Sequence, residues 1–479
     1  MGRETLKWIL LIILGCTSCS KVGTVSGSTP GELPVPDGIH VVFNHSDLTR
    51  YRSPLTDQWR NGDNLEEFIV NAINEAQQEI LVAVQELSLP GIAEALVAAK
   101  QRGVSIKMVM ENTYSQPWGD LHEADLSLDR RRQLTQLKKL ADRNGDNTLS
   151  VEEFRRGDAV AILRRHQIPL IDDTEDGSKG SGLMHHKFLV IDGHIVITGS
   201  ANFSSSGIHG DAGARKTRGN VNHLLRFDST ELAELFKKEF LLMWGDGPGG
   251  AKDSRFGLAK NSSGIQVVRV GNTRIEVLFP PHDKHQKLNG LKFIGEQIST
   301  SKKDIDMALF VFSAQSLANE LQERVKHGVR VRLIADPAFA SRSYSEVLDL
   351  LGVALPDRFC KIEAGNKPFD SPLKGVGTPR LARGDKLHHK FAVIDNKTVI
   401  TGSFNWSPAA AHTNDETLLV IRSHKLAAHF TREMDRMWRS AELGITPRLQ
   451  RKLERQRVKC GSGVERSSVN NESLDNHSD

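Results

Sequence analysis

The order of apolar and polar positions along the chain occurs twice. Short apolar or alternating runs predict strands, and apolar residues that recur every three or four positions predict amphipathic helices. These segments follow one another as strand, helix, strand, helix, strand in each half. The first series is 39–43, 65–77, 80–84, 91–102 and 104–110, and the second is 275–279, 291–299, 305–310, 317–327 and 329–335. This alternation predicts an α/β fold made of two repeats, each with a largely buried sheet.

A longer segment follows in each half and contains the most detailed part of the repeat. Residues 183–203 read LMHHKFLVIDGHIVITGSANF, and residues 387–406 read LHHKFAVIDNKTVITGSFNW. The shared polar residues lie 203 positions apart in every case: His185 and His388, Lys187 and Lys390, Asp192 and Asp395, Ser200 and Ser403, Asn202 and Asn405. One more strand and a long amphipathic helix, at 229–244 and 425–438, end each repeat. So long a spacing is not expected twice by chance, and it indicates an internal duplication.

The residue types in these two motifs suit cleavage of a phosphodiester bond. The reaction needs a nucleophile, a proton for the leaving oxygen and positive charge around the phosphoryl oxygens. Histidine can supply the first two near neutral pH. A His and a Lys two residues apart on a strand share one face, so each repeat offers one of each, and two repeats facing each other would complete a site. The turns after Asp192 and Asp395 leave a structural role open for both. His186 and His389 point to the opposite face and are expected to pack.

The spacing H-x-K-x4-D-x6-G-S-x-N resembles the signature of the phospholipase D superfamily. The resemblance implies two α/β/α repeats related by a pseudo-twofold axis around one active site, in a monomer. It implies that one motif His forms a phosphohistidine and that the other protonates the leaving alcohol and then activates water, without a metal. The motif lysines, aspartates and histidines are then the expected catalytic residues, and the motif serines and asparagines are expected to support or bind the phosphate.

In that superfamily an acidic residue downstream of each motif typically orients the histidine, and here the two halves differ. Glu416 fills the position in the second half. Asn222 aligns with it in the first half, with Asp211 as a rival candidate. A carboxylate partner stabilises imidazolium and suits a general acid, whereas a neutral amide suits a nucleophile. We therefore hypothesise that Asn222 orients the nucleophile, His185. Glu416 would orient the general acid, His388.

The first half carries 22 extra residues between strand 104–110 and its motif. Within them, DRNGDNTLSVEE at 142–153 matches the EF-hand calcium loop. Position 6 of that loop is Asn147 rather than Gly, and Asn tolerates the left-handed conformation better than most residues. We expect Ca²⁺ to brace an inserted lobe at about 113–182; an acidic surface loop that binds nothing is the alternative. The six predicted ligands are Asp142, Asn144, Asp146, Thr148, Ser150 and Glu153.

The N-terminus is typical of an export signal. Two basic residues precede an apolar run at 8–14 that is too short to cross a bilayer. Residues 13–16, ILGC, resemble a bacterial lipobox, which implies acylation of Cys16; an ordinary secretory signal without lipid is the alternative. We expect a signal peptide at 1–15 and a flexible tether at 16–36. The protein is then a membrane-anchored lipoprotein of the cell envelope, or periplasmic or secreted.

The remaining boundaries follow from the repeat. The first repeat is expected at 37–247, a linker rich in Gly, Ser and Lys at 248–270, and the second repeat at 271–441. The tail from 442 is basic and then polar, and its run RLQRKLERQRVK predicts a frayed, solvated helix that leads into a disordered end. Cys360 and Cys460 could form one disulfide, but two cysteines fix no pairing by pattern.

The substrate is less well constrained by the sequence. A net charge of +4, from 63 basic and 59 acidic residues, makes no global case for nucleic acid. The HHK and NDE segments resemble the bacterial endonuclease and cardiolipin-hydrolase branch of the superfamily. The preferred prediction is hydrolysis of the head-group phosphodiester bond of phospholipids, because an exported and tethered enzyme would lie beside phospholipid. An exported endonuclease acting on DNA or RNA is the alternative, and a non-catalytic calcium-binding scaffold is a distant third.

Overall fold

The computed structural model describes residues 33–178, 182–211, 216–261, 263–461 and 465–466. The predicted signal peptide, Cys16 and the predicted tether up to residue 32 lie outside the described residues. Within the described residues, no helix is long and apolar enough to span a bilayer.

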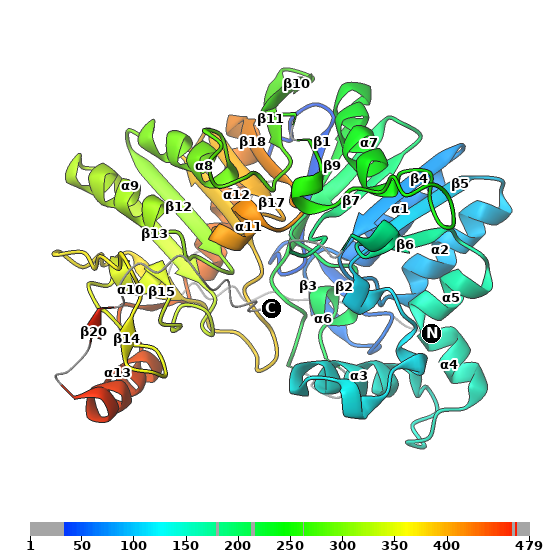
Figure 1. Ribbon diagram of the computed structural model, residues 1–479, viewed down its shortest axis with the longest axis horizontal. Coiled ribbons are helices and arrows are strands. Elements are labelled where there is room, and N and C mark those ends of the chain that lie inside the picture. The colour runs from blue at the N-terminus through cyan, green and yellow to red at the C-terminus, as the bar shows by residue number, and fades with distance from the viewer. Residues whose placement is uncertain (1–32, 179–181, 212–215, 262, 462–464, 467–479) are drawn as a thin grey trace, which may run out of the picture. The chain divides into compact units, whose positions relative to one another are not determined.

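The first half is built on a seven-stranded sheet (Figure 1). Its elements are β1 (Ile39–Phe43), β2 (Arg50–Arg52), β3 (Trp59–Asn61), α1 (Leu65–Glu75), β4 (Glu79–Val84), α2 (Pro90–Gln101), β5 (Ser105–Met110), α3 (Leu128–Ala141), α4 (Val151–Gly157), α5 (Ala159–Arg165), β6 (Leu170–Asp172), β7 (Lys187–Ile191), β8 (Ile195–Gly199), α6 (Ser205–Ile208), β9 (His223–Asp228) and α7 (Thr230–Trp244). The strand order is β1-β9-β8-β7-β4-β5-β6. β4 pairs in parallel with β5 and antiparallel with β7, so the first motif strand lies in the interior of the sheet.

The second half repeats this arrangement in a nine-stranded sheet of order β10-β11-β18-β17-β16-β12-β13-β15-β19. Its elements are β10 (Gln266–Val270), β11 (Thr273–Leu278), α8 (Gly290–Ser299), β12 (Asp304–Leu309), α9 (Gln315–Lys326), β13 (Arg330–Ala335), α10 (Glu346–Leu350), β14 (Lys361–Ile362), β15 (Val376–Thr378), β16 (Lys390–Ile394), β17 (Thr398–Gly402), α11 (Pro408–His412), β18 (Leu418–Arg422), α12 (His424–Trp438), β19 (Glu442–Leu443), α13 (Pro447–Cys460) and β20 (Glu465–Arg466). β12 pairs in parallel with β13 and antiparallel with β16, as β4 does with its neighbours. The predicted α/β fold of two repeats is confirmed.

The structure places two boundaries differently from the sequence prediction. β6 pairs in parallel with β5, as β15 does with β13, so β6 belongs to the repeat and not to the insertion. The added lobe is therefore shorter than 113–182 and consists mainly of α3, α4 and the loop between them (Figure 1). β10 pairs with β11 in the second sheet, so the connection between the halves ends before Gln266 rather than at residue 270.

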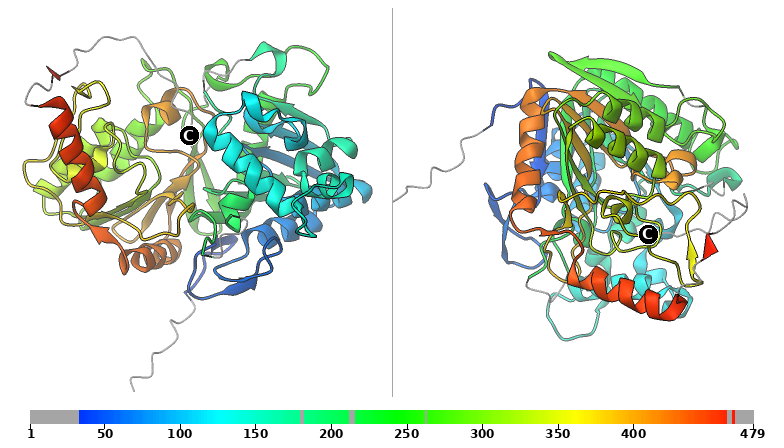
Figure 2. Two further views of the ribbon diagram at one scale, coloured as in Figure 1. Left: turned by 90° about the horizontal axis from the view of Figure 1, so that it is seen from below. Right: turned by 90° about the vertical axis from the view of Figure 1, so that its left-hand side faces the viewer.

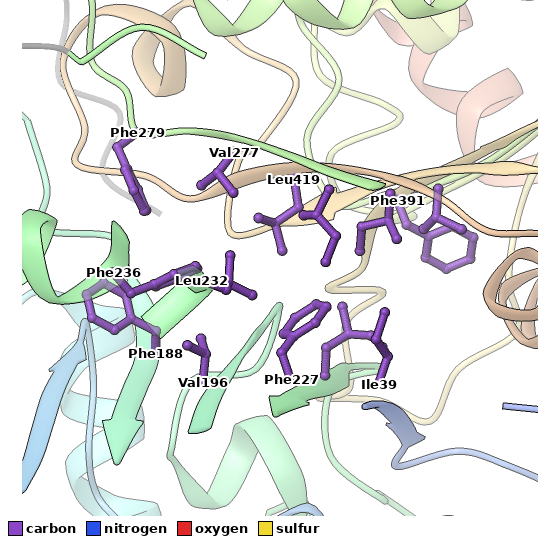
Figure 3. Packing of buried hydrophobic residues seen from close by; sticks show 14 of the residues in the cluster. Ile39, Phe188, Val196, Phe227, Leu232, Phe236, Val277, Phe279, Phe391 and Leu419 are labelled. Atoms are coloured by element: carbon purple, nitrogen blue, oxygen red, sulfur yellow. The ribbon is translucent and has the colours of Figure 1, made fainter. Parts of the chain in front are cut away.

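One apolar cluster joins the two halves. Phe188, Phe227 and Phe236 of the first half belong to the same buried cluster as Phe391 and Leu419 of the second (Figure 3). Helices α7 and α12 contribute their apolar faces to this cluster, while α1, α2 and α5 cover the other face of the first sheet and α8 and α9 that of the second. Because these phenyl rings are fully buried, truncating one of them to Ala is expected to cost about 3–5 kcal/mol of stability. The halves are thus held together next to the motif strands.

Helix α13 lies where the sequence predicts a solvated helix, and most of its side chains are exposed or half-buried. The Thr446 side chain caps its first turn, and Leu449 is buried against the second half. Cys460, at its other end, forms a disulfide with Cys360, which settles the pairing that the sequence left open. Figure 2 shows α13, in red, lying along the second half. The predicted disordered end, from residue 467, lies outside the described residues.

Candidate active site

The two motifs meet where the halves exchange backbone hydrogen bonds. The His185 N–H donates to Asp415 O at 2.9 Å, and the Asp415 N–H donates to Leu183 O at 2.9 Å. On the other side of the pseudo-twofold axis, the His388 N–H donates to Val221 O at 3.0 Å, and the Val221 N–H donates to Lys386 O. Each motif histidine therefore enters the site beside a segment of the opposite half.

This crossing determines which residue orients each imidazole. Nδ1 of His185 lies 2.8 Å from Oε2 of Glu416, and Nδ1 of His388 lies 3.0 Å from Oδ1 of Asn222. The predicted pairs were within each half, and that prediction is wrong: Asn222 and Glu416 directly follow the residues that form the crossing bridges. Asp211, the other candidate for orienting His185, instead lies beside Thr217 and does not contact either motif histidine in the described structure.

Both orienting contacts are made to Nδ1, which leaves Nε2 for the reaction. Within the described part of the chain, Nε2 of neither ring has a hydrogen-bond partner. The two rings are nearly fully buried, with 4% of His185 and 8% of His388 exposed. Two nitrogen atoms on facing motifs can then act on one phosphorus from opposite sides.

The motif lysines and asparagines surround the same space. Lys187 Nζ donates to His185 O at 2.7 Å, and Lys390 Nζ donates to His388 O at 2.8 Å, so each ammonium is held beside its histidine. The buried side-chain oxygens of Asn202 and Asn405 have no hydrogen-bond partner in the described structure. Buried side-chain oxygens without partners are rare, which marks this space as one that a bound molecule would fill.

The motif serines support the orienting residues rather than facing the substrate. Ser200 Oγ donates to Asn222 Oδ1 at 2.8 Å, and Ser403 Oγ donates to Glu416 Oε2. The glycine before each serine permits this approach to the next strand. A Cβ on Gly402, whose φ is +130°, would lie 2.2 Å from Thr417 O. The G-S pair of each motif therefore holds the orienting strand against the motif strand.

Burial and charge shift the titration of these groups. Burial, with the ammonium groups of Lys187 and Lys390, lowers the pKa of His185 well below its usual value. Burial and the same two lysines also lower the pKa of His388. Burial raises the pKa of Glu416 to about 7, against the opposing effect of Lys187. The free site therefore favours neutral imidazoles, so each of the two rings keeps an unprotonated Nε2 that could act as a nucleophile.

The predicted catalytic role of Asp192 and Asp395 requires correction. Asp192 follows the end of β7, about 16 Å along the strand from Lys187. Its carboxylate accepts hydrogen bonds from the amides of Gln77, Gln78 and Glu79 at 2.7–2.9 Å. Burial raises the pKa of Asp192, but these amides outweigh burial and bring the pKa below its usual value.

Asp395 makes the equivalent contacts with the amides of residues 302–304. Both aspartates adopt a φ of 51° at the turn after the motif strand. They join the hairpin to the start of the neighbouring strand, and the structural role that the sequence left open is the one observed.

His186 and His389 pack on the opposite face, as predicted. His186 lies 2.8 Å from Thr417 Oγ1 and 3.1 Å from Glu239 Oε1. His389 lies 2.9 Å from His223 Nδ1 and 3.1 Å from Glu433 Oε1. These rings connect the shared core to the site and do not reach the reacting space.

Two residues that the sequence patterns did not single out make the halves unequal. Gln85, directly after β4, accepts a hydrogen bond from Lys187 Nζ at 3.2 Å. Its counterpart after β12 is Phe310, whose ring lies 4.9 Å from Lys390 Nζ and 4.7 Å from the His388 ring. The available signal was position: both residues follow the strand that flanks the motif strand in the sheet.

Lys260 was also missed. Its ammonium is buried between Glu239 and Asp415, 2.7 Å from the Asp415 carboxylate. The contact ties the connection between the halves to the residue that precedes Glu416. Nothing in the polar sequence of the connection distinguishes this lysine from its neighbours, because its partners are brought to it only by the fold.

The loop 142–150 has the hydrogen bonds of a tight calcium-loop turn. Asp142 Oδ2 accepts from the Asn147 amide at 3.0 Å, and Asn147 has the expected positive φ of 63°. Glu153, however, folds back onto Ser150 and the amide of Arg143 in a capping box. Within the described residues, no group of three or more His, Cys, Asp or Glu side chains is gathered as a metal site would require. Calcium binding therefore remains a prediction.

Comparison with known proteins supplies a family and a fold. A sequence family described as "Cardiolipin synthase, PLD-like domain" matches residues 69–244 and 294–438. The mitochondrial cardiolipin hydrolase of Xenopus tropicalis is 29% identical over 142 residues, which are 29% of this chain and 56% of the relative. The mitochondrial cardiolipin hydrolase of Drosophila melanogaster is 28% identical over 172 residues, 34% of this chain and 63% of the relative. The matches thus span little more than half the length of these curated relatives.

Among solved structures, the crystal structure of phosphatidylserine synthase from Haemophilus influenzae Rd KW20 superimposes with a TM-score of 0.54. The match covers 89% of this chain and 95% of that chain at 13% sequence identity. At that identity the likeness speaks for the fold alone.

We predict that Asp192→Ala lowers stability more than it lowers turnover. Three charge-assisted hydrogen bonds to backbone amides are lost, so the free energy of unfolding should fall by about 3 kcal/mol. Urea unfolding and turnover of bis(p-nitrophenyl) phosphate per folded molecule measure the two effects. Asp395→Ala should behave alike. Unchanged stability with abolished turnover would restore the catalytic assignment.

We predict that the loop 142–153 binds one Ca²⁺ when the Glu153 side chain rotates out of its capping box. Isothermal titration should show one site with a Kd within about 10⁻⁹ to 10⁻³ M, the span of EF-hand loops. Asp142→Ala should remove the heat, and Mg²⁺ serves as the control ion. If Ca²⁺ gives neither heat nor a rise in Tm, the loop is an ordinary helix connection.

Proposed function

The chain belongs to the family of phospholipase D-like domains, and from that premise we propose that it hydrolyses the head-group phosphodiester bond of phospholipids. The observation that carries the proposal is the pair of buried imidazoles, each presenting Nε2 and each oriented through Nδ1 by the opposite half. A single chain thereby holds two His-Lys pairs around one space, which is what in-line displacement at phosphorus needs.

The proposed reaction has two steps. Nε2 of His185 attacks phosphorus, the bond to the head-group oxygen breaks, and His388 donates a proton to that oxygen. The intermediate is a phosphohistidine. His388 then accepts a proton from water, the hydroxide attacks phosphorus, and the bond to His185 breaks to release phosphatidic acid. Lys187, Lys390 and the two motif asparagines stabilise the charge on the phosphoryl oxygens.

With the observed pairing, the rule applied to the sequence, that a carboxylate partner suits the general acid, would make His185 the acid. The charge changes during the reaction favour the opposite assignment, with His185 as the nucleophile. An attacking imidazole becomes positively charged and stays so throughout the intermediate, so an anion at Nδ1 stabilises the transition state more than the ground state. A general acid loses its charge in the same step, and a carboxylate beside it would oppose that loss. Asn222 is neutral and suits His388 on the same argument. A bound phosphodiester anion would raise the pKa of His388 and allow it to hold the proton it donates.

Several features favour a phospholipid over nucleic acid. The curated relatives that match are named cardiolipin hydrolases. Phe310 gives the His388 side of the site an apolar wall. The predicted export signal and acylation of Cys16 would hold the protein at a membrane of the cell envelope. Calcium, if bound at 142–153, would brace the added lobe and take no part in either step.

To test this, purified protein is incubated with phosphatidylglycerol or phosphatidylcholine vesicles and, separately, with single-stranded DNA and RNA. Each incubation is done once with Ca²⁺ and once with a chelator. We expect release of phosphatidic acid at a rate that does not depend on the chelator. The His185→Asn variant should release it at least 10³-fold more slowly. His186→Asn is the matched control, because its ring lies outside the reacting space. Cleavage of DNA or RNA without lipid turnover would make the protein an exported nuclease, and no turnover of any substrate would leave a non-catalytic scaffold.

A further inference from the structure

A groove on the second half is lined almost entirely by cations. Five basic side chains, together with Ala338 and Ser341, surround a space of about 580 Å³ and include no acidic residue. Among the residues that the structure describes, none of the five forms an ion pair, and Lys452 donates only to Ser341 O. The five are Arg342, Arg448, Arg451, Lys452 and Arg455.

The repulsion within this groove is not neutralised by the protein. Burial and the charges of Arg342 and Arg448 lower the pKa of Lys452. Charges of one sign held together without a counter-ion focus the field and attract an anion of matching extent. The groove is therefore prepared for a ligand that carries several negative charges.

The helix that frames most of the groove is anchored at both ends. Helix α13 carries six basic residues and one acidic residue, and supplies four of the five cations. Leu449 anchors the start of the helix, and the Cys360–Cys460 disulfide fixes its end. Lys459 Nζ adds a hydrogen bond to Arg358 O at 2.8 Å. The cations are thus presented on a helix whose two ends are held to the second half.

Two large apolar side chains are exposed at the disulfide-linked end of the same helix. Phe359 is 66% exposed and Val458 is 83% exposed. The Arg358 guanidinium lies 4.7 Å from the Phe359 ring, and Val458 follows Arg451 and Arg455 by seven and three positions on one face of α13. Exposed apolar groups among arginines and lysines are typical of surfaces that enter the interface of a bilayer.

The groove leads toward the catalytic residues. It shares Ala338, Ser341 and Arg448 with a second cavity of about 530 Å³, which is lined by Asp336 and Lys386 at its other end. The Asp336 carboxylate accepts from the amide of Leu387, the residue before His388. The Lys386 ammonium lies 5.2 Å from the Phe310 ring. A lipid drawn to the groove would thus lie next to the side of the site that holds the proton donor.

We propose that the groove, α13 and the exposed pair Phe359 and Val458 form one docking surface for an anionic phospholipid bilayer. A groove lined by arginines can bind lipid phosphates, and the apolar pair would enter the membrane–water interface beside them. A single-stranded nucleic acid fits less well, because no aromatic side chain lines either cavity to stack a base. The inference goes beyond the proposed function, since docking needs no turnover.

The test uses the full chain with Cys16→Ser, which removes the predicted acylation site, and sedimentation with vesicles of phosphatidylcholine alone or with 30% phosphatidylglycerol. We expect binding to the anionic vesicles only, weakened at least tenfold by Arg451→Ala with Arg455→Ala. Phe359→Ser should weaken binding without changing its dependence on salt. The matched control is Arg132→Ala with Lys139→Ala, which removes the same charge from exposed positions of α3. Circular dichroism and an intact disulfide check that each variant folds.

Four results would overturn the proposal: no binding of the parent protein to anionic vesicles, equal binding to neutral vesicles, equal loss in the control pair, or binding to single-stranded DNA in place of vesicles. Turnover of a soluble short-chain phospholipid separates docking from catalysis. The α13 variants should keep that turnover, whereas His185→Asn should lose it and still bind vesicles.

Discussion

The exchange of orienting residues between the halves is the constraint on which the rest of the site depends. Glu416 and Asn222 each follow a residue that is hydrogen-bonded through its backbone to the opposite motif. Neither half by itself therefore contains both a motif histidine and the residue that orients it. The shared apolar cluster and the buried Lys260 hold the two halves in the one register that makes both contacts. Lys260 and Asp415 form a buried charged pair, and removing one partner of such a pair costs about 3–5 kcal/mol of stability. Because Asp415 precedes Glu416, the packing of the halves and the orientation of His185 are coupled.

Within this symmetric frame, two pairs of unlike residues make the two sides chemically different. A carboxylate faces His185 where an amide faces His388, and a glutamine binds one lysine where the ring of Phe310 faces the other. A symmetric pair of motifs would leave the roles of nucleophile and acid undecided. Under the proposed roles, the side that gains positive charge has the anion, and the side that releases a proton has the apolar wall. The duplication would then supply the two His-Lys pairs, and divergence of the residues around the two histidines would assign their roles.

Much of the fold could be predicted from the sequence because its signals are local. The two series of strands and helices, the motif strands and the packing of His186 and His389 follow from periodicity of two or of three to four residues. The crossed pairing could not be predicted, since Glu416 lies in the same half as His388 along the chain and only the bridges Met184–Asp415 and Val221–Leu387 bring it to His185. The solvated helix α13 could be predicted from its composition. Its disulfide could not, because Cys360 and Cys460 lie 100 positions apart along the chain and two cysteines fix no pairing by pattern.

The most direct test of the proposed roles locates the phosphorylated histidine. A phosphodiester with a p-nitrophenol leaving group needs no acid, so the His388→Asn variant should release one equivalent of p-nitrophenol in a burst and then stall. Mass spectrometry of the stalled protein should find the phosphoryl group on His185, and adding Glu416→Gln should slow the burst by about 10²-fold or more. Phosphate on His388 in the His185→Asn variant, with no burst from His388→Asn, would contradict both the assignment of nucleophile and acid and the role of Glu416 in stabilising the attacking imidazole.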